Sequence, residues 1–481
     1  MDHNAVKPIA FYLPQFYRTA ENDEWWGKGF TEWRSAATAT PLFEGQHQPQ
    51  LPADLGFHTQ TDVQTLRAQT DLAKANGIHG FCHYYYWFDG QRLLNKPTEL
   101  MLNTPDLDMP FCLCWANEHW TRRWDGKDED VLMPQSYDLE RYEEFAQSLI
   151  PYFSDSRYIC ADDKPVFLIY RAQEVPNLVK LCAAIRRSAK AAGRSGAYIL
   201  GAETFVHYGE WPDPTQRGLD GAVEFPPHGI EQHELCLTEK GKVSPKFTGH
   251  IFSGFQVLMG ALRRSKPNYP LHRTVFPSWD NTARLDTRAN IFIGTSPQWF
   301  GEWLSAMFDW TKLAHPPAKQ FLFVNAWNEW AEGAHLEPDL LYGSDYLEVV
   351  KSVTEGHFMS NAGIDMNELY AASQEERNAI LQQVRPFLQK NCALDLCMDD
   401  QKSRMKSVGR PYDSARRKYP YTLIINDRKQ VLKALLRTRN LNDFRRIVGN
   451  ALQVPNPTGR IDRFRNSLFQ FIHNTRRMGN R

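Results

Sequence analysis

Lys319-Gln-Phe-Leu-Phe-Val-Asn-Ala-Trp-Asn-Glu-Trp-Ala-Glu-Gly333 joins an apolar run to a group of acids and indoles. The apolar part, 320–324, has the composition of a strand that is buried on both faces of a parallel sheet. Two glutamates, Glu329 and Glu332, follow it among tryptophans. The stretch therefore predicts a buried strand whose carboxyl end carries acidic side chains beside aromatic rings.

Seven similar short apolar runs precede this one, and segments of helical or loop type separate them. The eight predicted strands are 8–13, 77–87, 110–115, 165–170, 197–201, 221–225, 273–276 and 320–324. The predicted helices between them include 61–75, 139–152, 175–192 and 299–314. Eight buried parallel strands with helices between them predict an α/β fold, a (β/α)8 or TIM barrel.

Polar and aromatic motifs follow these strands at their carboxyl ends. Asn117 and Glu118 come after the third strand, Asp280 after the seventh and Glu329 after the eighth. The active sites of (β/α)8 barrels lie at that end. The motifs therefore predict one site at the barrel mouth.

Paired carboxyl groups are typical of glycosidic-bond chemistry, in which one carboxyl is kept protonated and the other is ionised. Glu329 and Glu332 can both face the mouth if their segment turns helically. A second pairing stays open, in which Glu118 is the acid/base and Glu329 the nucleophile, with carboxyls about 5 to 5.5 Å apart. In a third interpretation Glu118 binds sugar hydroxyls.

Candidate substrate-binding residues surround these acids. An indole offers an apolar face and a polar edge, which suit a sugar ring, and Trp87, Trp115 and Trp120 are the candidate platforms. The other candidates are Asn117, Glu118, Asp280, Trp327, Asn328, Trp330 and Glu337. Side chains alternate along the run 84–88, and the sequence does not decide which half of them faces inward.

Three of the motifs, in this order, resemble those of a known family: Gly29-Phe-Thr-Glu-Trp33, Trp115-Ala-Asn-Glu-His-Trp120 and Asn328-Glu-Trp-Ala-Glu-Gly333. They are similar to glycoside hydrolase family 99, the endo-α-mannosidases, and more closely to the bacterial WbsX-like glycosyltransferases. The resemblance implies that Glu329 is the base acting on the sugar 2-hydroxyl and that Glu332 is the general acid/base. It does not extend to residues 361–481.

Charge is distributed unevenly along the chain, although the formal net charge is zero. Residues 401–481 carry roughly +16, which leaves roughly −16 on the remainder. We therefore expect two parts, a catalytic barrel over 1–360 and a basic, mainly helical C-terminal extension over 361–481. The extension fits peripheral contact with a membrane surface or a packed helical appendix. Nucleic acid is its least favoured partner.

The cysteines and the termini bear on the compartment. None of the 8 cysteines forms a CxxC pair or has zinc-ligand spacing, which is typical of reduced, buried thiols. No export signal or long apolar segment is present, so we expect a cytoplasmic protein, with peripheral contact at the inner membrane. No ligand cluster or glycine-rich nucleotide loop is found, and we predict no metal and no cofactor.

These observations favour a glycosyltransferase of bacterial surface polysaccharide biosynthesis, such as the assembly of the O-antigen of lipopolysaccharide. Its partners would be a lipid-linked glycan acceptor and a nucleotide-sugar donor. One alternative is a retaining glycoside hydrolase resembling the endo-α-mannosidases. A second alternative is a non-catalytic glycan-binding barrel.

Overall fold

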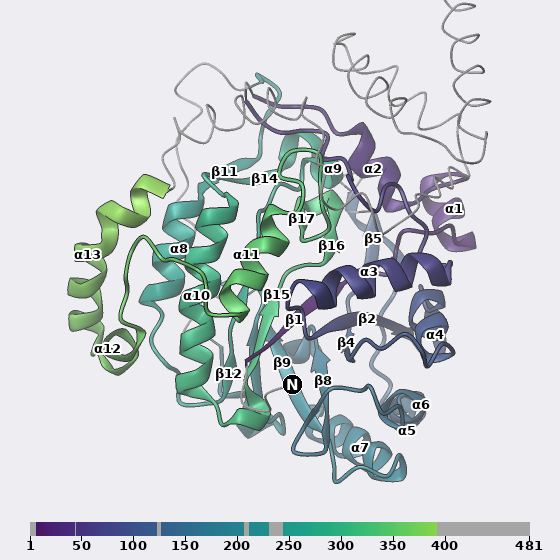
Figure 1. Cartoon of the computed structure of the whole chain (residues 1–481). Helices are drawn as coiled ribbons and strands as arrows, with labels where there is room; N and C mark the ends of the chain where they lie inside the picture. Colours follow the sequence, from purple (N-terminus) through teal and green to yellow (C-terminus); the bar gives the residue numbers. More distant parts are fainter. Residues whose placement is uncertain (1–5, 44, 123–126, 206–210, 230–243, 392–481) are drawn as a thin grey trace, which may run out of the picture. The chain divides into compact units, whose positions relative to one another are not determined.

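The computed structural model describes residues 6–43, 45–122, 127–205, 211–229 and 244–391 (Figure 1). Parallel strands form its central sheet in the order β12-β10-β9-β8-β4-β2-β1-β15-β13. Their bounds are β1 Lys7–Tyr12, β2 Gly80–Phe88, β4 Phe111–Trp115, β8 Lys164–Ile169, β9 Tyr198–Glu203, β10 Gly221–Glu224, β12 Leu271–His272, β13 Thr274–Val275 and β15 Phe321–Val324.

The two ends of this sheet meet, so that it forms a barrel. β12 and β13 are halves of one stretch interrupted at Arg273, and β12 pairs with β10 while β13 pairs with β15. β1 lies between β2 and β15. The predicted (β/α)8 barrel is thereby confirmed, with each predicted strand within a few residues of its observed position.

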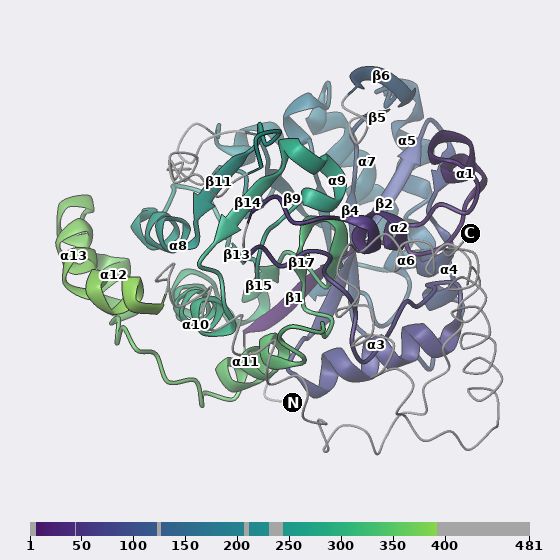
Figure 2. The ribbon, with the colours of Figure 1, turned by 90° about the horizontal axis from the view of Figure 1, so that it is seen from above.

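Helices lie around the strands (Figure 2). They include α3 (Val63–Ala75), α7 (Leu178–Ala191), α10 (Pro297–Ala314) and α11 (Asp345–Thr354). The predicted helix 139–152 is instead a 3-10 turn followed by α5 (Tyr142–Gln147) and α6 (Ile150–Phe153). Pro151 stands in the first turn of α6, where its missing amide hydrogen is tolerated.

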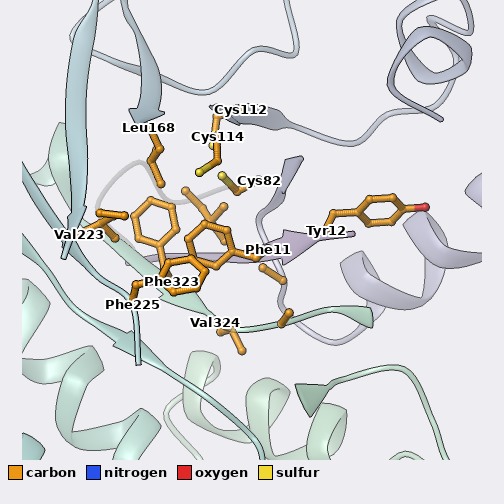
Figure 3. Packing of buried hydrophobic residues seen from close by; sticks show 14 of the residues in the cluster. Phe11, Tyr12, Cys82, Cys112, Cys114, Leu168, Val223, Phe225, Phe323 and Val324 are labelled. Atoms are coloured by element: carbon orange, nitrogen blue, oxygen red, sulfur yellow. The ribbon is translucent and has the colours of Figure 1, made fainter. Parts of the chain in front are cut away.

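Large rings and small thiols fill the barrel interior together. The ring of Phe11 lies 4.9 Å from that of Phe225 and 5.5 Å from that of Phe323, centroid to centroid (Figure 3). Phe11 is in register with Cys82, and Cys82 with Cys112, so small side chains on β2 and β4 leave room for the rings. The described cysteines, Cys82, Cys112, Cys114, Cys160 and Cys182, are all free thiols.

Two further helices pack on the barrel helices beyond the predicted boundary at residue 360. α12 (Met366–Ala371) contacts α10, and α13 (Gln374–Asn391) contacts α8 (Gly254–Arg263) (Figures 1 and 2). Their apolar residues Leu369, Leu381 and Leu388 are buried. The rest of the predicted basic extension, 392–481, lies outside the described residues. In the part of the chain that the structure describes, no helix has the length and apolar character needed to cross a membrane.

Candidate active site

The two glutamates of the opening stretch lie directly after β15. The chain forms β16 (Asn328–Glu329), a 3-10 turn (Trp330–Glu332) and β17 (Ala334–His335). Asn328 is buried, and its side chain forms two hydrogen bonds with the main chain of Leu13, donating to the carbonyl (3.0 Å) and accepting from the amide (2.8 Å). Asn328, a predicted substrate contact, thus ties this segment to the end of β1.

Asp280 holds the other side of the same segment. Its backbone amide donates to the carbonyl of Glu332 (2.8 Å), and its carboxylate accepts from Gln46 Nε2 (2.8 Å) and from the amide of Thr282 (3.0 Å). The Asp280 carboxylate, another predicted substrate contact, is therefore engaged in positioning the loop after β13. It also orients the start of α9 (Thr282–Leu285), the short helix that carries Arg284.

Arg284 brings the acids of the site together. Its Nη2 donates to Glu329 Oε2 (2.8 Å) and to Glu32 Oε1 (2.9 Å), and its Nη1 donates to Glu332 Oε1. The side chain of Glu332 is 21% exposed, that of Glu329 is 5% exposed, and that of Glu32 is not exposed. One carboxyl of the predicted pair therefore faces the mouth, and the other lies beneath it.

Burial and neighbouring charges give these groups unusual proton affinities. Burial raises the pKa of Glu329 to about 8; Arg284 opposes this shift, and the charges of Glu332 and Glu32 add to it. Burial also raises the pKa of Glu32, against the pull of Arg284. Glu329 is thus a carboxyl that holds its proton near neutral pH, the state needed in a general acid.

Two tyrosines of β2 face the same acids, which identifies the inward half of the run 84–88. Burial raises the pKa of Tyr84 and of Tyr86 well above their ordinary value, and in both cases the charge of Glu329 is the next contribution. Tyr85 points to the outer side, where its hydroxyl hydrogen-bonds with Ser148 Oγ (2.7 Å).

Glu337 and two of the predicted indoles form a buried group of their own. Glu337 accepts hydrogen bonds from Trp330 Nε1 (2.6 Å), Trp327 Nε1 (3.0 Å) and Gln69 Nε2 (2.6 Å), and it pairs with His58 (3.2 Å). Trp327, Trp330 and Glu337 are at most 2% exposed. Sequence reasoning proposed that they contact substrate; in the structure they are buried and support the segment that carries the glutamates.

The three predicted sugar platforms occupy different positions. Trp87 and Trp115 are buried against Phe145 of α5, at centroid distances of 5.2 and 4.4 Å, so neither offers an open face to a sugar. Trp120 is half-buried beside Trp25 (5.3 Å) and Tyr86. Of the three, Trp120 alone retains the exposure that a platform needs.

Asn117 and Glu118, after β4, have different roles from one another. Asn117 is buried, and its side chain donates to Tyr137 Oη (3.0 Å) and accepts from the amide of Arg171 (2.8 Å), which ties β4 to the chain after β8. Glu118 is partly exposed and pairs with Arg171 (3.1 Å). Burial raises the pKa of Tyr170, and the charges of Glu118 and Glu332 add to that shift.

With this geometry in hand, comparisons with known proteins place the chain. Residues 8–350 match the family described as glycosyltransferase WbsX. The chain belongs to this family. The resemblance indicated by its motifs is thereby confirmed.

Two curated proteins called "Uncharacterized protein WxcX" are similar to this WbsX family chain. They come from Xanthomonas campestris pv. campestris, strains B100 and ATCC 33913, and each is 38% identical over 343 residues. The match covers 71% of this chain and 49% of theirs, so the chain spans about half the length of these relatives.

Among solved structures, the GH99 endo-α-mannosidase from Bacteroides thetaiotaomicron is similar to the WbsX family chain. It is 14% identical, and the match covers 74% of this chain and 98% of that one, with a TM-score of 0.46. A glycoside hydrolase-like protein is 15% identical over 74% of this chain and 95% of its own, with a TM-score of 0.47.

Glu32 is the site residue that sequence reasoning missed in the WbsX family chain. It lies in the motif Gly29–Trp33, but 252 residues separate it from its partner Arg284. Its signal was an acid within a motif otherwise made of apolar residues, glycine and threonine. In the described residues, no group of three or more His, Cys, Asp or Glu is arranged to hold a metal ion.

Proposed function

We propose that this chain is an enzyme that forms or breaks glycosidic bonds, and that its reaction is sugar transfer in the assembly of a bacterial surface polysaccharide. Its donor would be a nucleotide sugar and its acceptor a lipid-linked glycan. The observation that carries the proposal is the meeting of Glu329 and Glu332 on the two arms of the Arg284 guanidinium, one carboxyl buried and one facing the mouth. Membership of the WbsX family supports the transferase form.

The two carboxyls have different tasks in this proposal. Glu329, whose pKa is raised to about 8 by burial, gives its proton to the oxygen that leaves the anomeric carbon. Glu332, the more exposed carboxylate, takes the proton of the incoming hydroxyl. This assignment reverses the roles that the family resemblance implies, and it rests on the burial that raises the pKa of Glu329.

Turnover by the purified protein tests the proposal. Wild type, Glu329→Gln and Glu332→Gln would be offered nucleotide sugars with a lipid-linked acceptor and, separately, α-mannosides. We expect a lengthened acceptor with wild type, and a fall in kcat of about 100-fold or more in each variant. Release of free sugar from the mannosides, abolished by the same variants, would replace transfer with hydrolysis. Full activity in both variants would overturn the assignment of these carboxyls.

Glu118→Gln separates the two possible carboxyl pairs. If Glu118 only binds a substrate hydroxyl beside Arg171, its amide variant raises KM and leaves kcat nearly unchanged. A fall in kcat as large as that of Glu332→Gln would favour the pairing of Glu118 with Glu329.

A further inference from the structure

Glu32 is a buried acid at the centre of the site that has no access to substrate. Its side chain, in the first turn of α2 (Glu32–Thr38), has no solvent exposure, and its Oε1 accepts from Arg284 Nη2 at 2.9 Å. Its other oxygen, Oε2, is buried without a hydrogen-bond partner. A buried charge is costly unless a partner offsets it, and Arg284 is the cation that offsets the charge of Glu32.

One nitrogen of Arg284 connects Glu32 with Glu329. Nη2 donates to both carboxyls, at 2.9 and 2.8 Å, while Nη1 donates to Glu332. Three carboxyls therefore share one cation. Because carboxylates this close repel one another, they do not all remain ionised, and the position of Glu32 decides how much of the cation's charge is left for the other two.

We propose that Glu32 is a positioning residue which, by sharing Arg284 with Glu329, sets the protonation state of Glu329. The proposal deepens the proposed function and rests on it for its catalytic meaning, but its protonation claim can be tested without turnover. Glu32 itself takes no part in bond making.

Among the residues that the structure describes, the charged and titratable groups that face Glu329 come from four elements. They are Arg284 on α9, Glu332 on the 3-10 turn, Glu32 on α2, and Tyr84 and Tyr86 on β2. The charge of Glu32 raises the pKa of Glu329, and the charge of Arg284 lowers it. Removing one charge or the other should therefore move the titration of Glu329 in opposite directions.

Infrared spectroscopy of the full-length protein can follow that titration directly. The band of the protonated carboxyl that Glu329→Gln abolishes would be recorded against pH in wild type, Glu32→Gln and Arg284→Gln. We expect the midpoint to fall by about one pH unit in Glu32→Gln and to rise by about one unit in Arg284→Gln. If the substitutions instead loosened the structure, water would enter and the midpoint would fall in both variants, because burial is the main cause of the raised pKa of Glu329.

Glu203→Gln is the matched control. Glu203 is another buried glutamate bound to an arginine, Arg264 (2.7 Å), and it lies at the end of β9 within a separate network that includes Glu224. This variant should leave the titration midpoint of the Glu329 band unchanged. An unchanged midpoint in Glu32→Gln, or a lowered one in Arg284→Gln, would overturn the proposal.

Turnover provides a second, separate measurement. The alkaline limb of kcat should follow the infrared midpoint in Glu32→Gln while KM stays at its wild-type value. If the midpoint of the Glu329 band shifts in Glu32→Gln but the protein shows no turnover, the proposed function is refuted and the inference about Glu32 stands. If the band midpoint shifts in Glu32→Gln but the alkaline limb of the kcat profile does not, Glu329 is not the proton donor.

Discussion

The amide of Asp280 donates to the carbonyl of Glu332 at 2.8 Å, so the loops after the seventh and eighth strands of the barrel are joined main chain to main chain. The next residue, Gly333, has φ +62°, and a Cβ there would come within 2.9 Å of the Asp280 amide nitrogen and carbonyl oxygen. The close approach that places Glu332 therefore depends on a missing side chain.

Gly333→Ala tests this dependence, with Gly343→Ala as its control. Gly343 has φ +58° and open space around it, so alanine there meets only the left-handed backbone cost, about 1–2 kcal/mol. Gly333→Ala adds the collision with Asp280, and we expect it to lower the free energy of unfolding by about 1–3 kcal/mol more. Denaturant unfolding of both variants measures the difference. Equal losses would mean that the Asp280 contact does not constrain Gly333.

The pH dependence of kcat distinguishes the two assignments of Glu329. Its pKa is raised to about 8 by burial, so the protonated form is lost above that pH. If Glu329 is the general acid, kcat falls as the pH rises through 8. The opposite slope would restore the role of base that the family resemblance implies. The measurement is a kcat profile from pH about 6 to 10 at saturating substrate.

Glu337→Gln should weaken the fold rather than substrate binding. Burial opposes the Glu337 charge, but His58 and the hydrogen bonds from Trp330 and Gln69 outweigh it and hold the carboxyl pKa below its ordinary value. An amide cannot satisfy the same donors, and we expect a loss of about 1–3 kcal/mol at neutral pH.

The sign of the pH effect at Glu337 follows from its lowered pKa. The carboxylate contributes stability above its unfolded-state pKa, and this contribution is lost as the pH falls through the folded-state value. The stability gap between wild type and Glu337→Gln should therefore narrow on acidification, which unfolding curves at neutral and acid pH would measure. A raised KM with unchanged stability in Glu337→Gln would instead indicate that Glu337 contacts the substrate.

The eight strands could be predicted because each is a short, continuous apolar run, and burial on both faces leaves that mark on any parallel strand. The region after residue 360 was predicted to be mainly helical, and its described part contains α12 and α13. The helical stretch divides before Gln374, where Ser373 and Glu376 form a reciprocal capping box, with hydrogen bonds of 3.3 and 2.9 Å. The spacing Ser-x-x-Glu was visible in the sequence as a start signal.

The site was only partly predictable, because its partners are distant in the chain. Glu329 and Glu332 follow from their place after a strand, whereas no local pattern pairs Glu32 with Arg284. The sequence also left the inward faces of the strands undecided. On β4 the cysteines face the crowded interior, and Trp115 therefore faces the helices, where a large ring fits against Phe145.

The hydrogen bonds between the main chain of Leu13 and the side chain of Asn328 span 315 residues, and β1 pairs with β15. During synthesis the first strand therefore leaves the ribosome long before its last neighbour exists. One edge of the growing sheet stays unpaired until the residues beyond 324 have emerged, and for that time it can pair with other chains. The strand that completes the barrel directly precedes Glu329 and Glu332, so the proposed catalytic acids are set in place only when the open edge disappears.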